Sequence, residues 1–127
     1  MKNFISIIEI ATKDFSRAVA FYKAILNISI EEIEMEGIQM GLFPNDGEKI
    51  SVQLINGSEY KTSSDGTIVY LNAGDALQIV ANKIEANKGK MVVHKTEIGL
   101  EMGFYAMFID TEGNKLGYIL PTKLDMI

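Results

Sequence analysis

The stretch that decides the fold is residues 4–22, FISIIEIATKDFSRAVAFY, in which the spacing of the apolar side chains changes partway. Phe4 to Ile10 is rich in β-branched and apolar residues and predicts a strand. After Asp14, apolar side chains recur at the i, i+3, i+4 and i+7 spacing of a helix, at Ala18, Phe21, Tyr22 and Ile25. The stretch therefore predicts a strand followed by an amphipathic helix.

Residues suited to helix ends frame this helix. The Asp14 carboxylate can accept backbone N–H groups of the first turn, so Asp14 is the expected N-cap. Asn27 favours the left-handed conformation that ends many helices. Arg17, the only arginine of the chain, lies in the first turn and is expected to form a structural ion pair.

The same order of elements occurs twice along the chain. Three short strands are expected after the first helix, at 29–35, 38–43 and 49–54. Beyond a polar connector at about 56–65, the pattern restarts with a strand at 67–73 and a helix that Asp75 opens and Gly89 ends. Three more strands are expected at 90–98, 103–109 and 115–120. The sequence thus predicts one domain, 1–127, with a βαβββ module at about 1–55 and another at about 66–127.

Composition excludes several classes of function. The chain has 127 residues and no cysteine, so it has no disulfide framework, thiolate metal cluster or cysteine nucleophile. Its formal net charge of -5 has the wrong sign for binding nucleic acid phosphates. No apolar run approaches the length of a membrane span, and the first residues do not resemble a secretory signal. We therefore expect a soluble, cytoplasmic protein that binds neither nucleic acid nor membrane.

Three motifs resemble the vicinal-oxygen-chelate superfamily, which includes glyoxalase I, bleomycin-resistance proteins, fosfomycin-resistance enzymes and extradiol dioxygenases. They are Ile8-Glu9-Ile10 leading to residues 14–22, Val69-Tyr70-Leu71-Asn72, and Phe108-Ile109-Asp110-Thr111-Glu112-Gly113-Asn114. The resemblance implies an α+β fold in which two βαβββ modules form a curved, open, mixed sheet around a cavity. It also implies that the cavity is usually completed in a homodimer and that the partner is a small-molecule ligand.

The resemblance also assigns positions to the metal ligands of metal-dependent relatives. Those positions fall on Ile7, Ile68 and Gly117, none of which has a side-chain oxygen or nitrogen. The chain contains a single histidine, so one subunit cannot build a site of two histidines and a carboxylate. We therefore predict no metal site and no cofactor.

Alternation along the strands indicates which side chains share the faces of these three positions. Glu9 shares the face of Ile7, Tyr70 and Asn72 share that of Ile68, and Lys115 shares that of Gly117. Glu9 is either a cavity base or a residue at the open mouth paired with Lys115. Tyr70 either donates its hydroxyl to a ligand or packs its ring, and Asn72 either contacts a ligand or stabilises a turn. Gly117 leaves room for a bound molecule or for a neighbouring aromatic ring.

Two further segments supply candidate ligand-binding residues. Glu101 and Met102 lie between Gly99 and Gly103 in a loop that either gates the cavity or seals a dimer. Phe104 belongs to a run rich in methionine and aromatic residues, which forms either an adaptable apolar pocket or part of the core.

Two main hypotheses about function follow. The first is a metal-free protein that binds a small apolar or cationic molecule in a dimeric cleft. The second is a metal-independent lyase or isomerase of the glyoxalase-related type, with Glu9 as base and Tyr70 as acid. A divalent-metal glyoxalase or dioxygenase is the least favoured, and an interaction module with a filled cavity is a further alternative. The sequence does not separate binding from catalysis, because the same polar atoms serve both.

Overall fold

The order of elements repeats as predicted. The structure, a computed structural model, describes residues 3–47, 50–72, 77–99 and 103–120. The first half contains β1 (Ile7–Ala11), α1 (Phe15–Leu26), β2 (Glu31–Met35), β3 (Ile38–Leu42) and β4 (Ser51–Asn56). The second half contains β5 (Tyr70–Asn72), α2 (Leu77–Ala86), β6 (Lys90–Glu97), β7 (Phe104–Ile109) and β8 (Lys115–Leu120). The prediction of an α+β fold made of two βαβββ units is confirmed.

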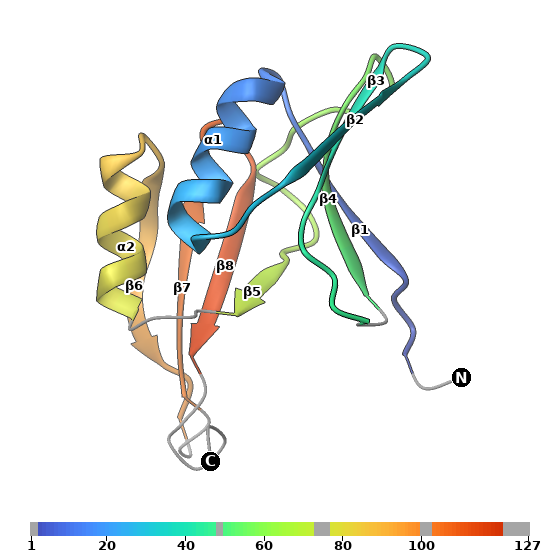
Figure 1. Cartoon of the computed structure of the whole chain (residues 1–127). Coiled ribbons are helices and arrows are strands. Elements are labelled where there is room, and N and C mark those ends of the chain that lie inside the picture. The colour runs from blue at the N-terminus through green and yellow to red at the C-terminus, as the bar shows by residue number, and fades with distance from the viewer. Residues whose placement is uncertain (1–2, 48–49, 73–76, 100–102, 121–127) are drawn as a thin grey trace.

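Each unit contributes one four-stranded mixed sheet. The strand orders are β1-β4-β3-β2 and β5-β8-β7-β6. In each sheet the first strand pairs in parallel with the last, and the other neighbours are antiparallel. The two sheets meet near the N-terminal end of α1 and diverge towards the other end (Figure 1). Within the described part of the chain, β1 and β5 are therefore edge strands, each with one free edge.

The core lies on the helix-facing side of both sheets. α1 buries one stripe of its surface, and α2 buries Leu77, Val80, Ala81 and Ile84 as the sequence spacing predicts. Ile10 and Leu54 of the first sheet and Ala106, Phe108 and Tyr118 of the second join the same buried cluster. Because both helices pack on this one side, neither helix covers the opposite face of either sheet.

β1 and β5 each begin three residues later than the sequence predicts. β1 begins at Ile7, opposite Ser51, rather than at Phe4, and the Phe4 side chain is fully exposed. Among the described residues, β5 spans Tyr70–Asn72, which pair with Gly117–Ile119 of β8. A β-rich run predicts a strand, but it does not predict how much of that run pairs with a neighbouring strand.

The ends of α1 confirm the predicted caps. The Asp14 side chain accepts a hydrogen bond from the Arg17 backbone N–H at 3.1 Å. Asn27 has a φ of 54° in the left-handed region, and the following N–H, of Ile28, returns to the carbonyl of Lys23. Asp75, the predicted cap of the second helix, lies outside the described residues.

At the end of α2 the predicted stop is one residue off. Lys88, not Gly89, adopts the left-handed conformation, with a φ of 74°. The Gly89 N–H bonds to the carbonyl of Ile84 at 2.8 Å. A Cβ at Gly89 would lie 2.7 Å from Ile84 Cγ2 and 2.8 Å from Phe21 Cε1. Glycine is therefore required at this position by close packing between α1 and α2.

We expect Gly89→Ala to lower the free energy of unfolding by about 1 to 3 kcal/mol, the usual cost of inserting a methyl group into a packed core. Urea unfolding followed by circular dichroism measures it. Lys88→Gly is the matched control, because it removes a side chain from the left-handed position and is expected to leave stability unchanged or slightly higher. An unchanged stability for Gly89→Ala would contradict the packing argument.

Candidate functional site

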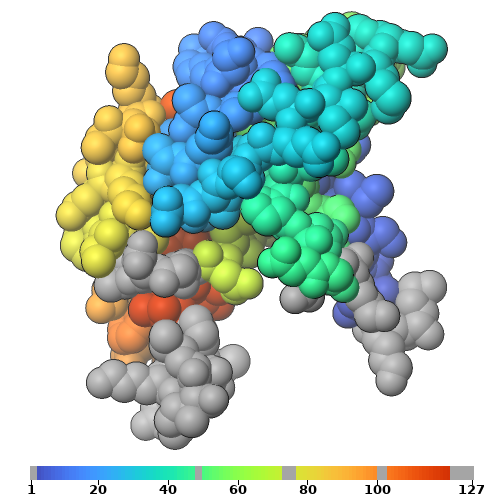
Figure 2. All heavy atoms as spheres, viewed as in Figure 1, coloured from blue at the N-terminus to red at the C-terminus, as the bar shows by residue number. Residues whose placement is uncertain are grey.

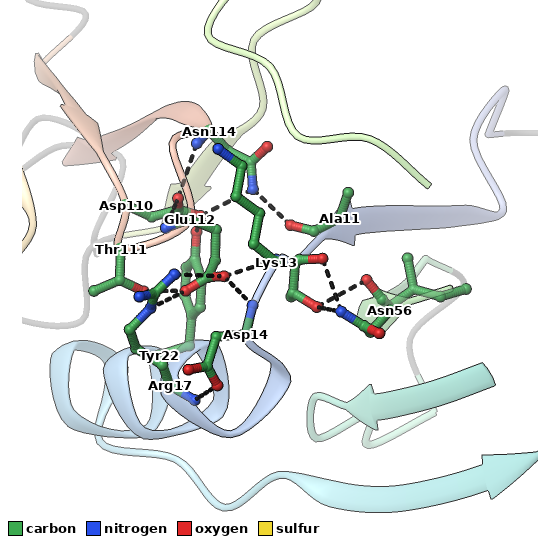
Figure 3. Close-up of polar contacts among 12 residues, drawn as sticks. Ala11, Lys13, Asp14, Arg17, Tyr22, Asn56, Asp110, Thr111, Glu112 and Asn114 are labelled. Carbon is green, nitrogen blue, oxygen red and sulfur yellow. Dashed lines mark hydrogen bonds and ion pairs between the residues drawn. The ribbon is translucent and has the colours of Figure 1, made fainter. Parts of the chain in front are cut away.

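The motif between β7 and β8 joins the two modules. Its Glu112 side chain is fully buried and lies at the N-terminus of α1 (Figure 3). Glu112 Oε1 accepts hydrogen bonds from the backbone N–H groups of Lys13 and Asp14, each at 2.7 Å. Arg17 Nε donates to Glu112 Oε2 at 2.8 Å. The ion pair predicted for Arg17 is confirmed, and its partner comes from the other module.

These contacts determine the ionisation of Glu112. Burial by itself raises the pKa of this carboxyl group. Hydrogen bonds from Arg17, from the Asp14 and Lys13 backbone and from Thr111 outweigh burial and lower the pKa from 4.5 to about 2. Glu112 is therefore ionised at neutral pH and serves as a second cap on α1, next to the positive end of the helix dipole.

Asp110 organises the rest of this junction. Its Oδ2 accepts a hydrogen bond from the hydroxyl of Tyr22 at 2.7 Å, and its Oδ1 accepts the backbone N–H groups of Glu112 and Asn114. Burial, followed by the nearby charge of Asp110, raises the pKa of Tyr22 well above its ordinary value. Asn114 Nδ2 donates to the carbonyl of Ala11 at the end of β1.

All of these junction contacts are made within the protein. Among the described residues, no buried side-chain nitrogen or oxygen lacks a hydrogen-bond partner. The junction therefore stabilises the packing of the modules, and the candidate functional surfaces are the sheet faces turned away from the helices.

In the first sheet that face carries an acidic row. Glu9 pairs with Gln53, Gln53 with Leu42, and Leu42 with Glu31, so these four side chains lie on one face across all four strands. The Gln53 amide donates to Glu9 Oε2 at 3.0 Å. A depression of about 480 Å³ on this side is lined by Ile7, Glu31, Leu42, Ser51 and Gln53 together with the segment from Phe43 to Asn45 and nearby residues.

In the second sheet the corresponding face is aromatic. Tyr70 pairs with Gly117 and Gly117 with Met107, while Ile119 pairs with Tyr105 in the adjacent row. The Tyr70 and Tyr105 rings meet edge to face with centroids 6.2 Å apart. A depression of about 470 Å³, within the size range of small-molecule sites, is lined by Tyr70, Tyr105, Met107 and Ile119 together with Thr96, Glu97 and Ile98.

The Tyr70 ring lies against Gly117. A Cβ at Gly117 would come within 2.5 Å of two Tyr70 ring atoms and 3.0 Å of the Ala106 carbonyl oxygen. Of the two possibilities that the sequence leaves open for this glycine, the structure shows the neighbouring aromatic ring. Any larger residue at position 117 would displace Tyr70.

The structure separates the other predicted site residues. Glu9 and Lys115 line the same depression near the module junction, but they do not form an ion pair with each other. Tyr70 lines a different depression. Asn72 lines a third cavity of about 300 Å³ between the modules, on the helix side. The two modules appear as two lobes in Figure 2. Ile68 is half-buried just before β5, and Glu101 and Met102 lie outside the described residues.

For Phe104, the sequence leaves a pocket and the core open, and its ring lies on the helix-facing side of the second sheet. Phe104 pairs with Leu120 and shares a face with Ala106 and Phe108, so its ring packs against the core. Lys95 Nζ lies 4.5 Å from the centre of this ring. The residue that faces the depression is its neighbour Tyr105, because strand side chains alternate between faces.

Sequence reasoning also missed three contributors to these surfaces. They are Gln53, Thr96 and Glu31, which the strand pairing places on these faces. For Glu31 the sequence contains a usable signal. Alternation along 31–35 places Glu31 and Ile33 on one face of the strand and Glu32 and Glu34 on the other.

The residues at the family's metal-ligand positions do not fit a metal ion. Ile7 and Ile68 have aliphatic side chains, and the space next to Gly117 holds the Tyr70 ring. Within the described ranges, no three histidine, aspartate or glutamate side chains form a group suited to a metal. In the same part of the chain, no helix combines the length and the apolar character needed to cross a membrane.

Comparison with known proteins is consistent with this arrangement. Residues 5–118 match the family described as Glyoxalase/Bleomycin resistance protein/Dioxygenase superfamily. No curated protein matches the chain.

Several solved structures share the fold. A glyoxalase/bleomycin resistance protein from Albidiferax ferrireducens has a TM-score of 0.72 at 14% identity, covering 93% of this chain and 99% of its own. A fosfomycin resistance protein from Listeria monocytogenes has a TM-score of 0.70 at 18% identity and is covered over 100% of both chains. A glyoxalase I mutant from Zea mays has a TM-score of 0.69 at 14% identity, covering 89% of this chain and 44% of its own. At these identities the similarity establishes the fold alone.

Proposed function

The chain belongs to the Glyoxalase/Bleomycin resistance protein/Dioxygenase superfamily, and from this premise we propose that it binds a small apolar or cationic molecule, without a metal, in a cleft completed by a second copy. The observation that carries the proposal is the position of the Tyr70 ring against Gly117. An apolar aromatic surface occupies the position at which the family resemblance places a metal-binding carboxylate. The site is thereby suited to holding a molecule by contact rather than by coordination.

The exposed edges of the two sheets support dimerisation. Ile5, Ile7 and Tyr70 are 50%, 59% and 45% exposed, respectively, near the free edges of β1 and β5. Unpaired edges with apolar side chains favour pairing with another chain. Pairing of β1 from one copy with β5 from another would place an acidic row opposite an aromatic face.

Catalysis by Glu9 and Tyr70 requires the same dimer. Within one chain the two residues line different depressions. The hydrogen bond from Gln53 orients the Glu9 carboxylate, which is the specific feature that favours a base at this position. In this second candidate function, Glu9→Gln abolishes turnover of a substrate that the intact protein converts, whereas a binding protein shows no turnover to lose.

Light scattering of the purified protein tests the dimer. We expect a dimer for the intact chain, and we expect Ile7→Lys to raise the dissociation constant by about tenfold or more, because a charge replaces apolar edge surface. Ile79→Lys is the matched control, since Ile79 is 48% exposed on α2, away from these edges. A monomer at all concentrations would contradict the cleft.

Metal content is tested separately by elemental analysis and by melting temperature in zinc, nickel, manganese and a chelator. A bound ion stabilises the folded state by mass action, so we expect neither stoichiometric metal nor a shift in melting temperature. A clear shift with one ion would overturn the metal-free proposal and favour glyoxalase or dioxygenase chemistry.

A further inference from the structure

A cavity of about 300 Å³ lies between the two modules, next to the C-terminal end of α1. The two sheets diverge towards this end of the helix (Figure 1). The first module lines the cavity with Ile25 of α1 and Val52 of β4, and the second with Val80 of α2, Phe108 of β7 and Tyr118 of β8. Both walls therefore belong to one chain, and they lie on the helix side of the sheets, away from the faces assigned to the dimeric cleft.

The floor of this cavity is apolar and buried. Ile25, Val80 and Phe108 are 3%, 4% and 0% exposed, respectively. Tyr118 is 2% exposed, and its hydroxyl donates to the carbonyl of Leu77 at 3.1 Å. Since this donor is already used, Tyr118 contributes its ring to the lining. These four side chains therefore provide contact surface without a charge or a free donor.

Apolar side chains also surround the mouth of the cavity. Five of the lining residues pack against the core but are only half-buried: Leu26, Ile28, Phe43, Val52 and Leu71. Ile50, which is 37% exposed, and the exposed Asn72 also border the mouth. None of the described residues that line the cavity is charged. The lining therefore matches a neutral occupant.

We propose that this cavity binds a small, neutral, apolar molecule within a single chain. An apolar cavity of about 150 Å³ stays dry and binds benzene, so a cavity of about twice that volume has room for about ten carbon atoms. Such a molecule gains van der Waals contacts with the half-buried side chains of the lining. An ion loses hydration on entering and meets no opposite charge. The site needs no second copy, so the inference goes beyond the proposed function and does not depend on it.

Three naphthalene derivatives of similar shape test the preference for a neutral molecule. The probes are neutral 2-naphthalenemethanol, the anion 2-naphthoate and the cation 2-naphthylmethylammonium. Dissociation constants are measured by calorimetry at pH 7.5. We expect the alcohol to bind about tenfold more tightly than either ion, because burying an unpaired charge is unfavourable. We also expect the alcohol to raise the melting temperature, since it binds the folded state.

Substitutions that fill the cavity test the location of the site. Val52→Phe and Ile28→Phe each place a larger side chain in the lining, and each is expected to weaken the alcohol about tenfold or more. Two positions are used because a larger residue at one of them can strain the packing. Val92→Phe is the matched control, since Val92 is 41% exposed on β6 and does not line the cavity. Ile7→Lys, which is designed to disrupt the dimer, is expected to leave this affinity unchanged.

The outcomes separate this inference from the proposed function. Equal affinity for the three probes, tighter binding of the cation, or no binding of the alcohol would overturn the neutral site. Unchanged affinity in folded Val52→Phe and Ile28→Phe would overturn its location. Binding that Ile7→Lys abolishes would assign the alcohol to the dimeric cleft, which contradicts this inference and supports the proposed function. Binding that survives Ile7→Lys and is lost in the cavity-filling variants supports the inference, whether or not the cleft exists.

Discussion

Glu112→Ala is expected to lower the free energy of unfolding by about 3 to 5 kcal/mol, the range observed when one partner of a buried ion pair is removed. The substitution leaves the backbone N–H groups of Lys13 and Asp14 without their acceptor and leaves Arg17 without its counter-ion. Urea unfolding at pH 7 measures the change. Glu59→Ala, which removes a carboxylate from an exposed position, should change stability by less than about 0.5 kcal/mol.

The pH dependence of stability provides an independent check on Glu112. Its pKa is about 2 in the folded protein, below the ordinary 4.5. A lowered pKa stabilises the folded state fully above the ordinary value, and this contribution is lost as the pH falls from about 4.5 to about 2. The stability difference between the intact protein and Glu112→Gln should therefore shrink over this window. A difference that stays constant down to pH 2 would show that the carboxylate's charge is unimportant.

Asp110→Ala is expected to cost about 3 kcal/mol, because it leaves a buried hydroxyl and two turn N–H groups without an acceptor. Tyr22, whose hydroxyl donates to Asp110 at 2.7 Å, is fully buried. Asn114 Nδ2 also loses one of its two acceptors, at 3.1 Å. The measurement is again urea unfolding at pH 7.

Tyr22→Phe separates the tyrosine contact from the rest of the Asp110 network. We expect this substitution alone to cost about 1 to 2 kcal/mol and the double substitution to cost less than the sum of the two. The reason is that the phenylalanine ring leaves no hydroxyl to be orphaned when Asp110 is removed. Strict additivity of the two changes would show that the Tyr22–Asp110 hydrogen bond contributes nothing to stability.

Much of the fold could be predicted because its signals are local. The positions of α1 and of its caps follow from Asp14, from the apolar spacing and from Asn27, all within one short stretch. The buried face of α2 follows from the same helical spacing. In both cases the residues that decide the structure lie within a few positions of one another, so a single sequence is sufficient.

The junction could not be predicted in this way. The Asp-Thr-Glu-Gly-Asn motif served only as part of a family resemblance, although its Glu112 caps a helix 98 residues earlier. When a cap is supplied by a turn far along the chain, no pattern in the residues around the helix indicates it. Arg17 was expected to have a charged partner, but nothing in the spacing of acidic residues indicated which one.

The candidate site was partly accessible to sequence reasoning. Alternation placed Glu9, Tyr70 and Gly117 on the faces that turn away from the helices, and the strand pairing agrees. The face of Phe104 could not be predicted, because a run of apolar residues does not reveal which of two adjacent side chains faces the core. That choice depends on the register between β7 and β8.

The cap that Glu112 supplies to α1 affects the order in which the chain can fold during synthesis. Chains are synthesised from the N-terminus at about 5 to 20 residues per second, and segments that have emerged start to fold before the rest is made. Glu112 is added 98 residues after Asp14, so α1 lacks this acceptor from the second module through most of synthesis. The first helix to emerge is thus completed late, because the part of its apolar stripe around Phe21 packs against Phe108 of β7.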